Sequence, residues 1–269
     1  MNVVKKYIKL LSMGFQSGLE YRADFFLRIV SGMFVIIVQC FLWTAVFRNS
    51  PDSVVYGYTY GQMITYVIIA ALVAQMSSTG FQWEIAYDVK DGGLSKFLAQ
   101  PVNYTLYRVF SFFGKKLSQI LLLTVMTFAV LTGCTFFLDF ELSLTRILLF
   151  FVFISFAIMI NFLIYYCLST LAFVMLEVWG VFTLANQTIL FLSGGVFPLD
   201  VFGEKMNAVL AFLPFKYIVY YPINVLNGRL APEDIKAGVM VEMVWIALLA
   251  ILACLLWKKN MKKYVAVGG

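Results

Sequence analysis

Long apolar stretches, separated by short segments that carry most of the charged residues, make up nearly the whole chain. A helix needs about 20 mainly apolar residues to cross roughly 30 Å of bilayer hydrocarbon. Stretches of that length predict six crossings and an all-α integral membrane protein of one transmembrane domain, residues 1–269. The crossings lie between Arg28 and Arg48, within Ser53 to Trp83, between Lys116 and Asp139, twice from Ile147 to Leu199, and from about Ala237 to Trp257.

The stretch from Ile147 to Leu199 contains a single charged residue, Glu177. At about 1.5 Å per residue it is long enough for two helices. We therefore expect the fourth and fifth crossings to be joined by a turn near Glu177. Glu242 is near the start of the sixth crossing, and we expect both glutamates at the boundary of the membrane.

Residues 1–24 combine an apolar line at helical spacing with lysines that lie off that line. The apolar residues are Val4, Ile8, Leu11, Phe15 and Leu19, and the lysines are Lys5, Lys6 and Lys9. This pattern is typical of a helix that lies in the membrane interface, and the alternative is an extension of the first crossing. Charged residues from Glu20 to Arg28 interrupt the segment, so it lacks the apolar core of a cleaved signal peptide.

Residues 84–116 form one long polar connection, which we expect on the cytoplasmic side. Asp91 is placed to cap a short helix, and Pro101 to end it. One face of that helix then carries three apolar residues, Leu94, Phe97 and Leu98. Such a helix either docks into a groove of a partner protein or lies back on the membrane, and docking is the interpretation we favour.

Residues 197–236 lie outside the membrane in this topology and are nevertheless strongly apolar. Surface patches of that size are normally covered. Short helices interrupted by Pro214 and Pro222, dipping part-way into the outer leaflet, account for both features. The alternative is a seventh crossing, which Lys216 in its middle disfavours.

The composition agrees with an integral membrane protein, since 62% of the residues are hydrophobic, 13% are charged and the mean hydropathy is +0.89. Soluble domains have about 45–50% apolar and about 25% charged residues. These values exclude a water-soluble enzyme, a disordered chain and a nucleic-acid-binding protein. With both termini in the cytoplasm, 14 of the 20 lysines and arginines lie on the inner side, which is the positive-inside bias of a multi-pass protein of the cell membrane.

The chain lacks the residues that several kinds of catalytic and cofactor-binding site require. The chain has no histidine, which excludes histidine-based zinc sites, catalytic triads and haem ligation. The nearest approach to a phosphate-binding loop, Phe113 to Lys116, lacks the first glycine and the hydroxyl residue of that motif. The four cysteines each lie in an apolar run, so we interpret them as buried apolar residues and expect no metal site. Any ATP chemistry must come from another chain.

Three elements of the sequence occur together in one known family. They are the basic N-terminus, the element Gly93-Leu94-x-x-x-Leu98-x-x-Pro101, and the run Ser193-Gly194-Gly195-Val196-Phe197-Pro198-Leu199 with the later Leu213-Pro214-Phe215, Tyr221-Pro222 and Gly228. With six crossings, they resemble the permease subunits of ABC transporters of the type-two (ABC-2) exporter family, in its six-span bacterial branch. The resemblance covers almost the whole chain and implies the fold of the type V exporters.

The resemblance also implies partners and sites. The permease works as a homodimer or with a related permease in the bilayer, and a separate ATP-binding cassette subunit holds ATP and magnesium, so this chain itself needs no cofactor. The helix that couples to this subunit contains Gly93, Leu94, Phe97, Leu98 and Pro101. The outer gate contains Gly194, Phe197, Pro198, Leu213, Pro214, Phe215 and Pro222.

Alternating access along the second and fifth crossings is a further implication of the resemblance. The polar residues that we single out as possible lining of the pathway are Gln75, Ser78, Thr183, Asn186 and Gln187. The alternative role for any one of them is hydrogen bonding between helices. Amides, hydroxyls and many phenylalanines suit an amphipathic or lipid-like cargo, moved outward, better than a small ion.

Two other classes of protein are alternatives. An ion-coupled secondary transporter needs carboxylates near the midplane of the membrane, whereas Glu177 and Glu242 are expected at the ends of crossings. An intramembrane enzyme needs a convergent acid or nucleophile, and the sequence contains no evident set of this kind.

Overall fold

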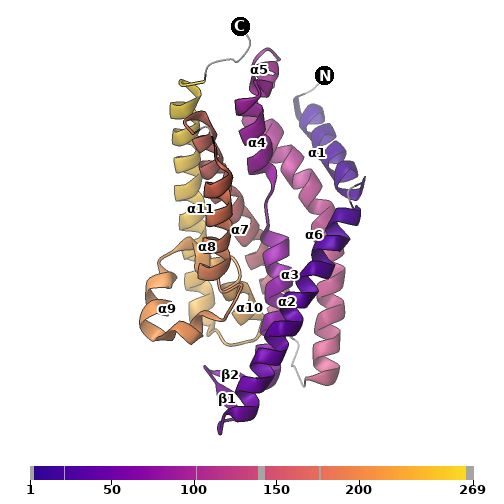
Figure 1. Cartoon of the computed structure of the whole chain (residues 1–269), viewed down its shortest axis with the longest axis vertical. Helices are drawn as coiled ribbons and strands as arrows, with labels where there is room; N and C mark the ends of the chain where they lie inside the picture. The colour runs from indigo at the N-terminus through magenta and orange to yellow at the C-terminus, as the bar shows by residue number, and fades with distance from the viewer. Residues whose placement is uncertain (1–2, 21, 101, 139–142, 176, 265–269) are drawn as a thin grey trace.

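The computed structural model describes residues 3–20, 22–100, 102–138, 143–175 and 177–264, and its secondary structure is almost entirely helical (Figure 1). The α-helices are α1 (Val3–Glu20), α2 (Arg22–Asn49), α3 (Tyr60–Ser77), α4 (Phe81–Lys90), α5 (Gly93–Leu98), α6 (Tyr104–Phe137), α7 (Leu144–Ser169), α8 (Trp179–Leu192), α9 (Gly203–Ala211), α10 (Tyr220–Leu226) and α11 (Pro232–Met261). Short 3₁₀ helices are η1 (Thr170–Phe173), η2 (Leu199–Phe202) and η3 (Pro214–Tyr217).

A two-residue hairpin, β1 (Val54–Val55) and β2 (Tyr58–Thr59), precedes α3. Its two strands are antiparallel, with Val55 paired to Tyr58. Tyr56 and Gly57 form the turn with φ angles of 51° and 79°, and positive φ at both positions is typical of the tightest hairpin turns. The apolar pattern does not predict this hairpin, because Tyr-Gly stands where Asn-Gly or Asp-Gly is the usual signal.

Five segments of the described chain are long and apolar enough to cross a membrane: Ile29–Asn49, Tyr60–Lys90, Tyr104–Phe137, Leu144–Phe173 and Pro232–Met261. α8 is also apolar, but its 14 residues span only about 21 Å. The predicted turn near Glu177 is confirmed, since residues 174–178 separate η1 from α8. The described residues thus contain five segments long enough to cross a membrane and one short apolar helix, where six full crossings are expected.

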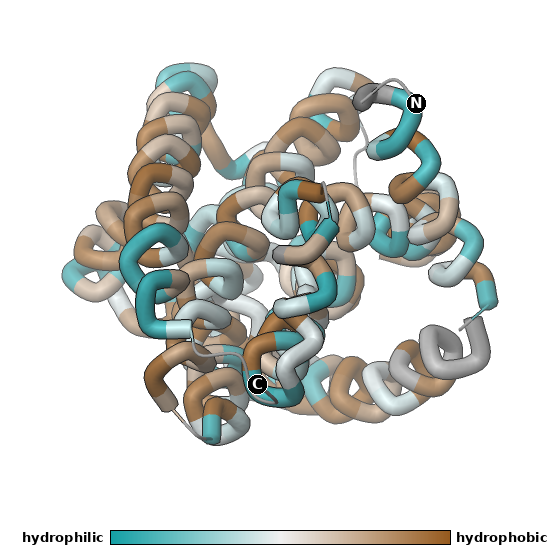
Figure 2. Tube along the Cα trace, turned by 90° about the horizontal axis from the view of Figure 1, so that it is seen from above, coloured by the Kyte–Doolittle hydropathy of each residue, from teal (hydrophilic) through white to brown (hydrophobic). Residues whose placement is uncertain are grey.

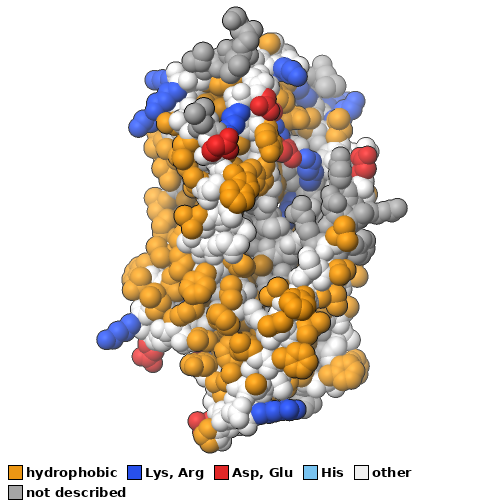
Figure 3. All heavy atoms as spheres, in the orientation of Figure 1, with side chains coloured by type: hydrophobic (Ala, Val, Ile, Leu, Met, Phe, Trp, Pro, Cys, Tyr) orange, Lys and Arg blue, Asp and Glu red, His pale blue; other side chains and the backbone are white. Residues whose placement is uncertain are grey.

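The two ends of the molecule differ from the band between them. α5, α1 and the last turns of α11 lie at one end, which we call the α5 end, and the hairpin lies at the opposite end, which we call the hairpin end (Figure 1). On the face shown in Figure 3, charged side chains gather near the α5 end, fewer lie toward the hairpin end, and hydrophobic side chains occupy the band between them. This distribution is expected of a protein whose ends lie in water and whose middle lies in lipid.

The centre of the molecule consists of α3, α4, α7 and α10. Phe150 and Phe153 of α7 are fully buried, and all residues of α10 are buried. α2, α6 and α11 lie farther out and expose apolar side chains such as Phe34, which is 71% exposed. Seen along the long axis, hydrophobic residues occur both in the middle of the molecule and around its periphery (Figure 2). Helices that are apolar on all sides are suited to a position between protein and lipid.

α1 packs tightly along the first half of α6 through small residues. A Cβ atom on Gly14 would lie 2.7 Å from the carbonyl oxygen of Ser111, and a Cβ atom on Gly114 would overlap the carbonyl oxygen of Leu11. Gly18 is similarly close to Ser118. Small residues four apart let two helix backbones approach closely in membrane proteins. The predicted helix within residues 1–24 is therefore present, and Ile8, on its apolar line, is 59% exposed.

The close approach of α1 and α6 predicts different effects of two glycine substitutions in α6. Gly114→Ala forces the backbones apart and should cost about 1–3 kcal/mol, so the melting temperature of the detergent-solubilised protein should fall. Gly133→Ala is the control, because a Cβ at Gly133 meets nothing within 4 Å and alanine has the higher helix propensity. Equal melting temperatures for the two variants would contradict the packing described here.

Candidate functional site

A cavity of about 450 Å³ lies between α3, α4 and α8. Its lining residues are Ala71, Ala74, Gln75, Ser78, Thr79, Gln82, Trp83, Phe182, Thr183, Asn186 and Leu190. Four of the residues predicted as pathway lining, Gln75, Ser78, Thr183 and Asn186, are thus brought together although they come from two distant segments. Gln187 is not among them, because it faces a separate, more open pocket with Thr188 and Phe191.

The cavity is polar but uncharged, since none of its lining residues is ionisable. The rings of Trp83 and Phe182 meet edge to face at 4.8 Å and form an apolar wall. Thr79 Oγ1 and Gln82 Oε1 are buried and have no hydrogen-bond partner among the described residues. Because buried polar atoms are rarely left unpaired, these two atoms mark where water or a polar group of a ligand would bind. The sequence pattern did not single out Gln82, which is 5% exposed.

The second predicted crossing is interrupted beside this cavity, because α3 ends at Ser77 and α4 begins at Phe81. The last carbonyl groups of a helix need donors from elsewhere. Lys116 Nζ of α6 donates to the carbonyl oxygens of Gln75 and Ser78, at 3.1 and 2.7 Å. Asn161 Nδ2 of α7 donates to the carbonyl oxygen of Ser77 at 2.6 Å. Lys116 is 2% exposed, and its charge also complements the negative end of the helix dipole.

α4 is joined to α6 by a partly buried ionic cluster. Arg108 pairs with both Glu84 and Asp88, the hydroxyl of Tyr104 donates to Asp88 Oδ2 at 2.5 Å, and Lys115 Nζ lies 2.7 Å from Glu84 Oε1. These contacts explain why the segment expected as a loop is mostly helical. Arg108 and Lys115 are paired with carboxylates of α4. Their charges therefore do not prevent α6 from beginning at residue 104, well before the predicted start.

α5 is the helix predicted within the element from Gly93 to Pro101, but its start differs from the prediction. Gly92, with φ of 72°, is the residue before its first turn, whereas Asp91 closes the end of α4 by donating its backbone N–H to the carbonyl oxygen of Tyr87. The expected capping of α5 by Asp91 is therefore wrong. The backbone at residue 92 is in the left-handed conformation. Glycine adopts this conformation without steric strain, which explains why a glycine lies between α4 and α5. Pro101 and the side chain of Leu98 lie outside the described residues.

The predicted docking face of α5 faces its own chain. Leu94 is fully buried, and the ring of Phe97 lies 5.1 Å from that of Tyr104 and 4.7 Å from that of Tyr107. These residues anchor α5 to α6, so the buried Leu94 is not open to a partner in this structure, while the coupling role of the element stays a prediction. Among the described side chains of residues 81–100, those of Tyr87, Asp91, Lys96, Ala99 and Gln100 are exposed.

The segment 197–236 folds against the hairpin end, and its apolar character is explained by burial of α10 between α3 and α7. Pro214 begins η3. Pro222 lies within the first turn of α10, where a missing N–H costs no helical hydrogen bond, so the expected interruption at Pro222 is wrong. The remaining residues assigned to the outer gate are Gly194, Phe197, Pro198, Leu213 and Phe215, and all of them are buried or partly buried.

A polar network around Asp200 connects this segment to the hairpin. Tyr58 and Tyr220 donate their hydroxyls to the Asp200 carboxylate, each at 2.8 Å, and Arg229 Nη1 lies 3.0 Å from it. The Arg229 guanidinium also lies over the Tyr58 ring, 3.5 Å from its centroid. Burial, with a smaller contribution from Tyr66, raises the pKa of Tyr58 well above its usual value, so this phenol remains a donor.

The two glutamates expected at the membrane boundary lie in different surroundings. Glu177 is exposed and lies 3.3 Å from Lys90 Nζ. Glu242 is fully buried, and neither of its carboxylate oxygens has a partner among the described residues. Glu242 is thus enclosed by protein, because η3 and α10 fold back over this part of α11, and its position at the membrane boundary stays a prediction. This burial depends on contacts that are remote in sequence, so hydropathy does not reveal it.

The fold and the cavity define a multi-pass helical membrane protein. A family model described as "ABC-2 family transporter protein" matches residues 33–268. The match covers most of the chain, so the protein belongs to the ABC-2 transporter family, which confirms the resemblance found in the sequence. Permeases of this family generally lack an ATPase domain of their own and pair with ATPase subunits. A search of curated proteins finds no match to the chain.

The ionic cluster predicts unequal effects of two substitutions in α6. Arg108→Gln leaves Asp88 without its cation and Glu84 with Lys115 alone. Because the two carboxylates are partly exposed, the cost should lie below the roughly 3–5 kcal/mol of a fully buried pair but above that of a surface pair. Lys115→Gln removes a half-exposed partner of Glu84 and should cost at most about 1 kcal/mol. The melting temperatures of both variants in detergent measure the difference, and Arg108→Gln combined with Glu84→Gln and Asp88→Asn should recover part of the loss. Equal costs would show that the cluster does not join α4 to α6.

Proposed function

We propose that this chain is the membrane-spanning permease subunit of an ATP-driven exporter, which moves an amphipathic or lipid-like substrate outward with energy from a separate nucleotide-binding subunit. The observation that carries the proposal is the uncharged polar cavity between α3, α4 and α8, with its aromatic wall of Trp83 and Phe182. Hydroxyl and amide groups can bind a polar headgroup there, and the aromatic wall can contact an acyl chain. A charged cargo would require compensating charges.

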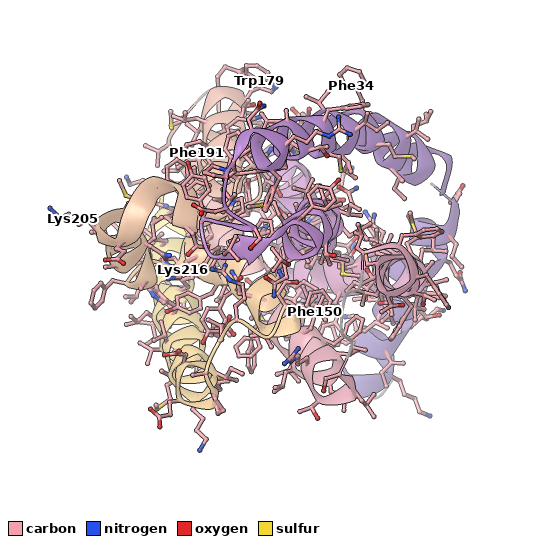
Figure 4. All side chains as sticks on the ribbon, turned by 90° about the horizontal axis from the view of Figure 1, so that it is seen from below. Phe34, Phe150, Trp179, Phe191, Lys205 and Lys216 are labelled. Atoms are coloured by element: carbon pink, nitrogen blue, oxygen red, sulfur yellow. The ribbon has the colours of Figure 1, made fainter. Side chains whose placement is uncertain are left out.

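The exposed surface of α8 supports pairing with a second permease, either a second copy or a related chain. Asn186, Gln187 and Thr188 are exposed, and uncharged polar groups in lipid are more stable when they bind other helices. Phe34 of α2 and Trp179 of α8 project from the same side of the molecule (Figure 4). A partner on this side covers the polar side chains of α8 and closes the cavity.

The position of α5 supports coupling to the ATP-binding subunit, which holds ATP and magnesium. In the proposed topology, six crossings of the type V arrangement place both termini and the α5 end in the cytoplasm. The partner then contacts the exposed side chains of Tyr87, Asp91 and Lys96, rather than Leu94. α4 runs directly from α5 to the interruption at residues 78–80, so a displacement of α5 reaches the wall of the cavity.

The network around Asp200 supports an outer gate that is closed in this structure. It joins the hairpin to η2, α10 and Arg229, and Asn207 of α9 also donates to Asp200 Oδ1 at 3.1 Å. Release of the cargo at the hairpin end requires these elements to separate. Ionic and hydrogen-bonded contacts suit this role, because water can replace them when the gate opens.

An ion-coupled secondary transporter is the second candidate, and the buried Glu242 is the observation that favours it. Carboxylates inside membrane segments are typical of proton- and sodium-coupled transporters. Membership of the ABC-2 family favours coupling to ATP. The two candidates differ in whether transport continues without ATP.

Filling the cavity should block transport. In proteoliposomes that contain the permease and its ATP-binding subunit, Thr183→Trp places a bulky ring in the cavity, so ATP-dependent movement of a fluorescent phospholipid analogue should fall to near background. Thr132→Trp is the matched control, because Thr132 is exposed on α6 and its hydroxyl donates to the carbonyl of Phe128 in its own helix.

Two results would overturn the proposal in different ways. Undiminished transport by Thr183→Trp would show that the cavity is not part of the pathway. Transport by the unsubstituted protein that continues without ATP, but stops in Glu242→Gln, would favour the ion-coupled alternative.

A further inference from the structure

The carboxyl group of Glu242 is enclosed within the chain, about three turns after the start of α11. The residue is fully buried, and both of its side-chain oxygens lack a hydrogen-bond partner among the described residues. Other buried ionisable groups described above, Arg108 and Lys116, do have partners. Glu242 is therefore a buried carboxyl group to which the surrounding residues give neither a cation nor a donor.

The outer segment covers Glu242 through two tyrosines whose hydroxyls are bonded elsewhere. Tyr221 packs against α11 at Gly238, one turn before Glu242, where a Cβ atom would overlap the Tyr221 hydroxyl. That hydroxyl donates to the backbone carbonyl of Asp234. The hydroxyl of Tyr217 donates to the carbonyl oxygen of Ala211 at 2.9 Å. Neither phenol is thus used to stabilise a charge on Glu242.

The other elements around this part of α11 supply no charge either. α7 runs beside α11 in the same direction, with Asn260 bonded to the carbonyl of Thr170 and Cys167 to that of Leu249. This register places residues 152–160 of α7 opposite Glu242, and none of these residues is ionisable. In η3, the ammonium of Lys216 bonds to the Asn207 side chain and backbone. On α11 itself, Asp234 and Lys236 are exposed.

The two tyrosines are themselves kept neutral by the same surroundings. Burial is the main cause that raises the pKa of Tyr217 to about 12. Burial is also the main cause that raises the pKa of Tyr221. The groups that face Glu242 are therefore neutral phenols and apolar side chains.

We propose that Glu242 is a proton-binding site, which holds a proton while Tyr217 and Tyr221 cover it and loses that proton when the outer segment moves away from α11. An unpaired carboxylate is far more costly to bury than a neutral carboxylic acid. Moving η3 and α10 away lets water reach the carboxyl group, and the ionised form then becomes stable. The site goes beyond the proposed export function, since it exists whichever cargo the chain moves and whichever partner supplies energy.

The test compares the pH dependence of stability in the full-length protein and in Glu242→Gln, whose amide imitates the protonated acid but does not titrate. In the unfolded chain Glu242 ionises near its ordinary value, whereas the folded chain keeps its proton. The folded state then binds more protons than the unfolded state, so stability falls as pH rises. We expect the melting temperature of the unsubstituted protein to fall by several degrees relative to Glu242→Gln between about pH 5 and pH 9.

A second pair of proteins tests the role of the cover. Tyr221→Ala opens the site to water. In this background, the pH-dependent difference in melting temperature between the proteins with and without Glu242→Gln should therefore be smaller. Tyr221→Phe retains the ring, and the difference should remain. Parallel pH profiles of the unsubstituted protein and Glu242→Gln would overturn the proposal, as would a loss of stability in Glu242→Gln at every pH. If Tyr221→Ala does not fold, the first comparison still decides the proposal, because it uses no cover variant.

Discussion

The ammonium group of Lys116, bound to the carbonyl end of α3, is the interaction on which the site depends. Without Lys116 the carbonyl group of Ser78 would lose its donor and that of Gln75 would keep only the Ser78 hydroxyl, which would favour one continuous helix from α3 into α4. Lys116 replaces those helical hydrogen bonds at the carbonyls that it reaches. The interruption then turns Ser78, Thr79 and Gln82 toward the cavity.

The same requirement for paired polar groups organises both ends of the molecule. At the α5 end, Arg108 holds α4 against α6 through Glu84 and Asp88. At the hairpin end, Asp200 gathers donors from the hairpin, from α10 and from Arg229. Between the two clusters the contacts are mainly apolar and aromatic, so they permit sliding and tilting of helices more readily than directional bonds do. The clusters therefore mark the elements that directional bonds hold together, α4 with α6 and the hairpin with η2 and α10.

The sequence predicted the features that depend on local composition. Apolar length was enough to find five long crossings and the turn at Glu177, and the glycine and proline elements identified the family. The pairing of charges was not predictable in this way, because Arg108, Lys116 and Glu242 find their surroundings on elements remote in sequence. Hydropathy treats each of them as a boundary of the membrane, whereas the structure pairs the first two and encloses the third. Four lining residues of the cavity could be predicted because they are polar residues within predicted crossings. Gln82 was missed because it follows the interruption of the helix.

The glycine contact between α1 and α6 has a consequence for biogenesis. Gly14 leaves the ribosome about a hundred residues before Gly114, so the small-residue face of α1 has no helix to bind while α2, α3, α4 and α5 are being made. During that interval the lysines and apolar residues of α1 can hold it at the membrane surface. Insertion of α6 then supplies the groove into which Gly14 and Gly18 fit. Closure of α1 onto α6 therefore has to wait until α6 has been made, although it can precede the synthesis of α7 to α11.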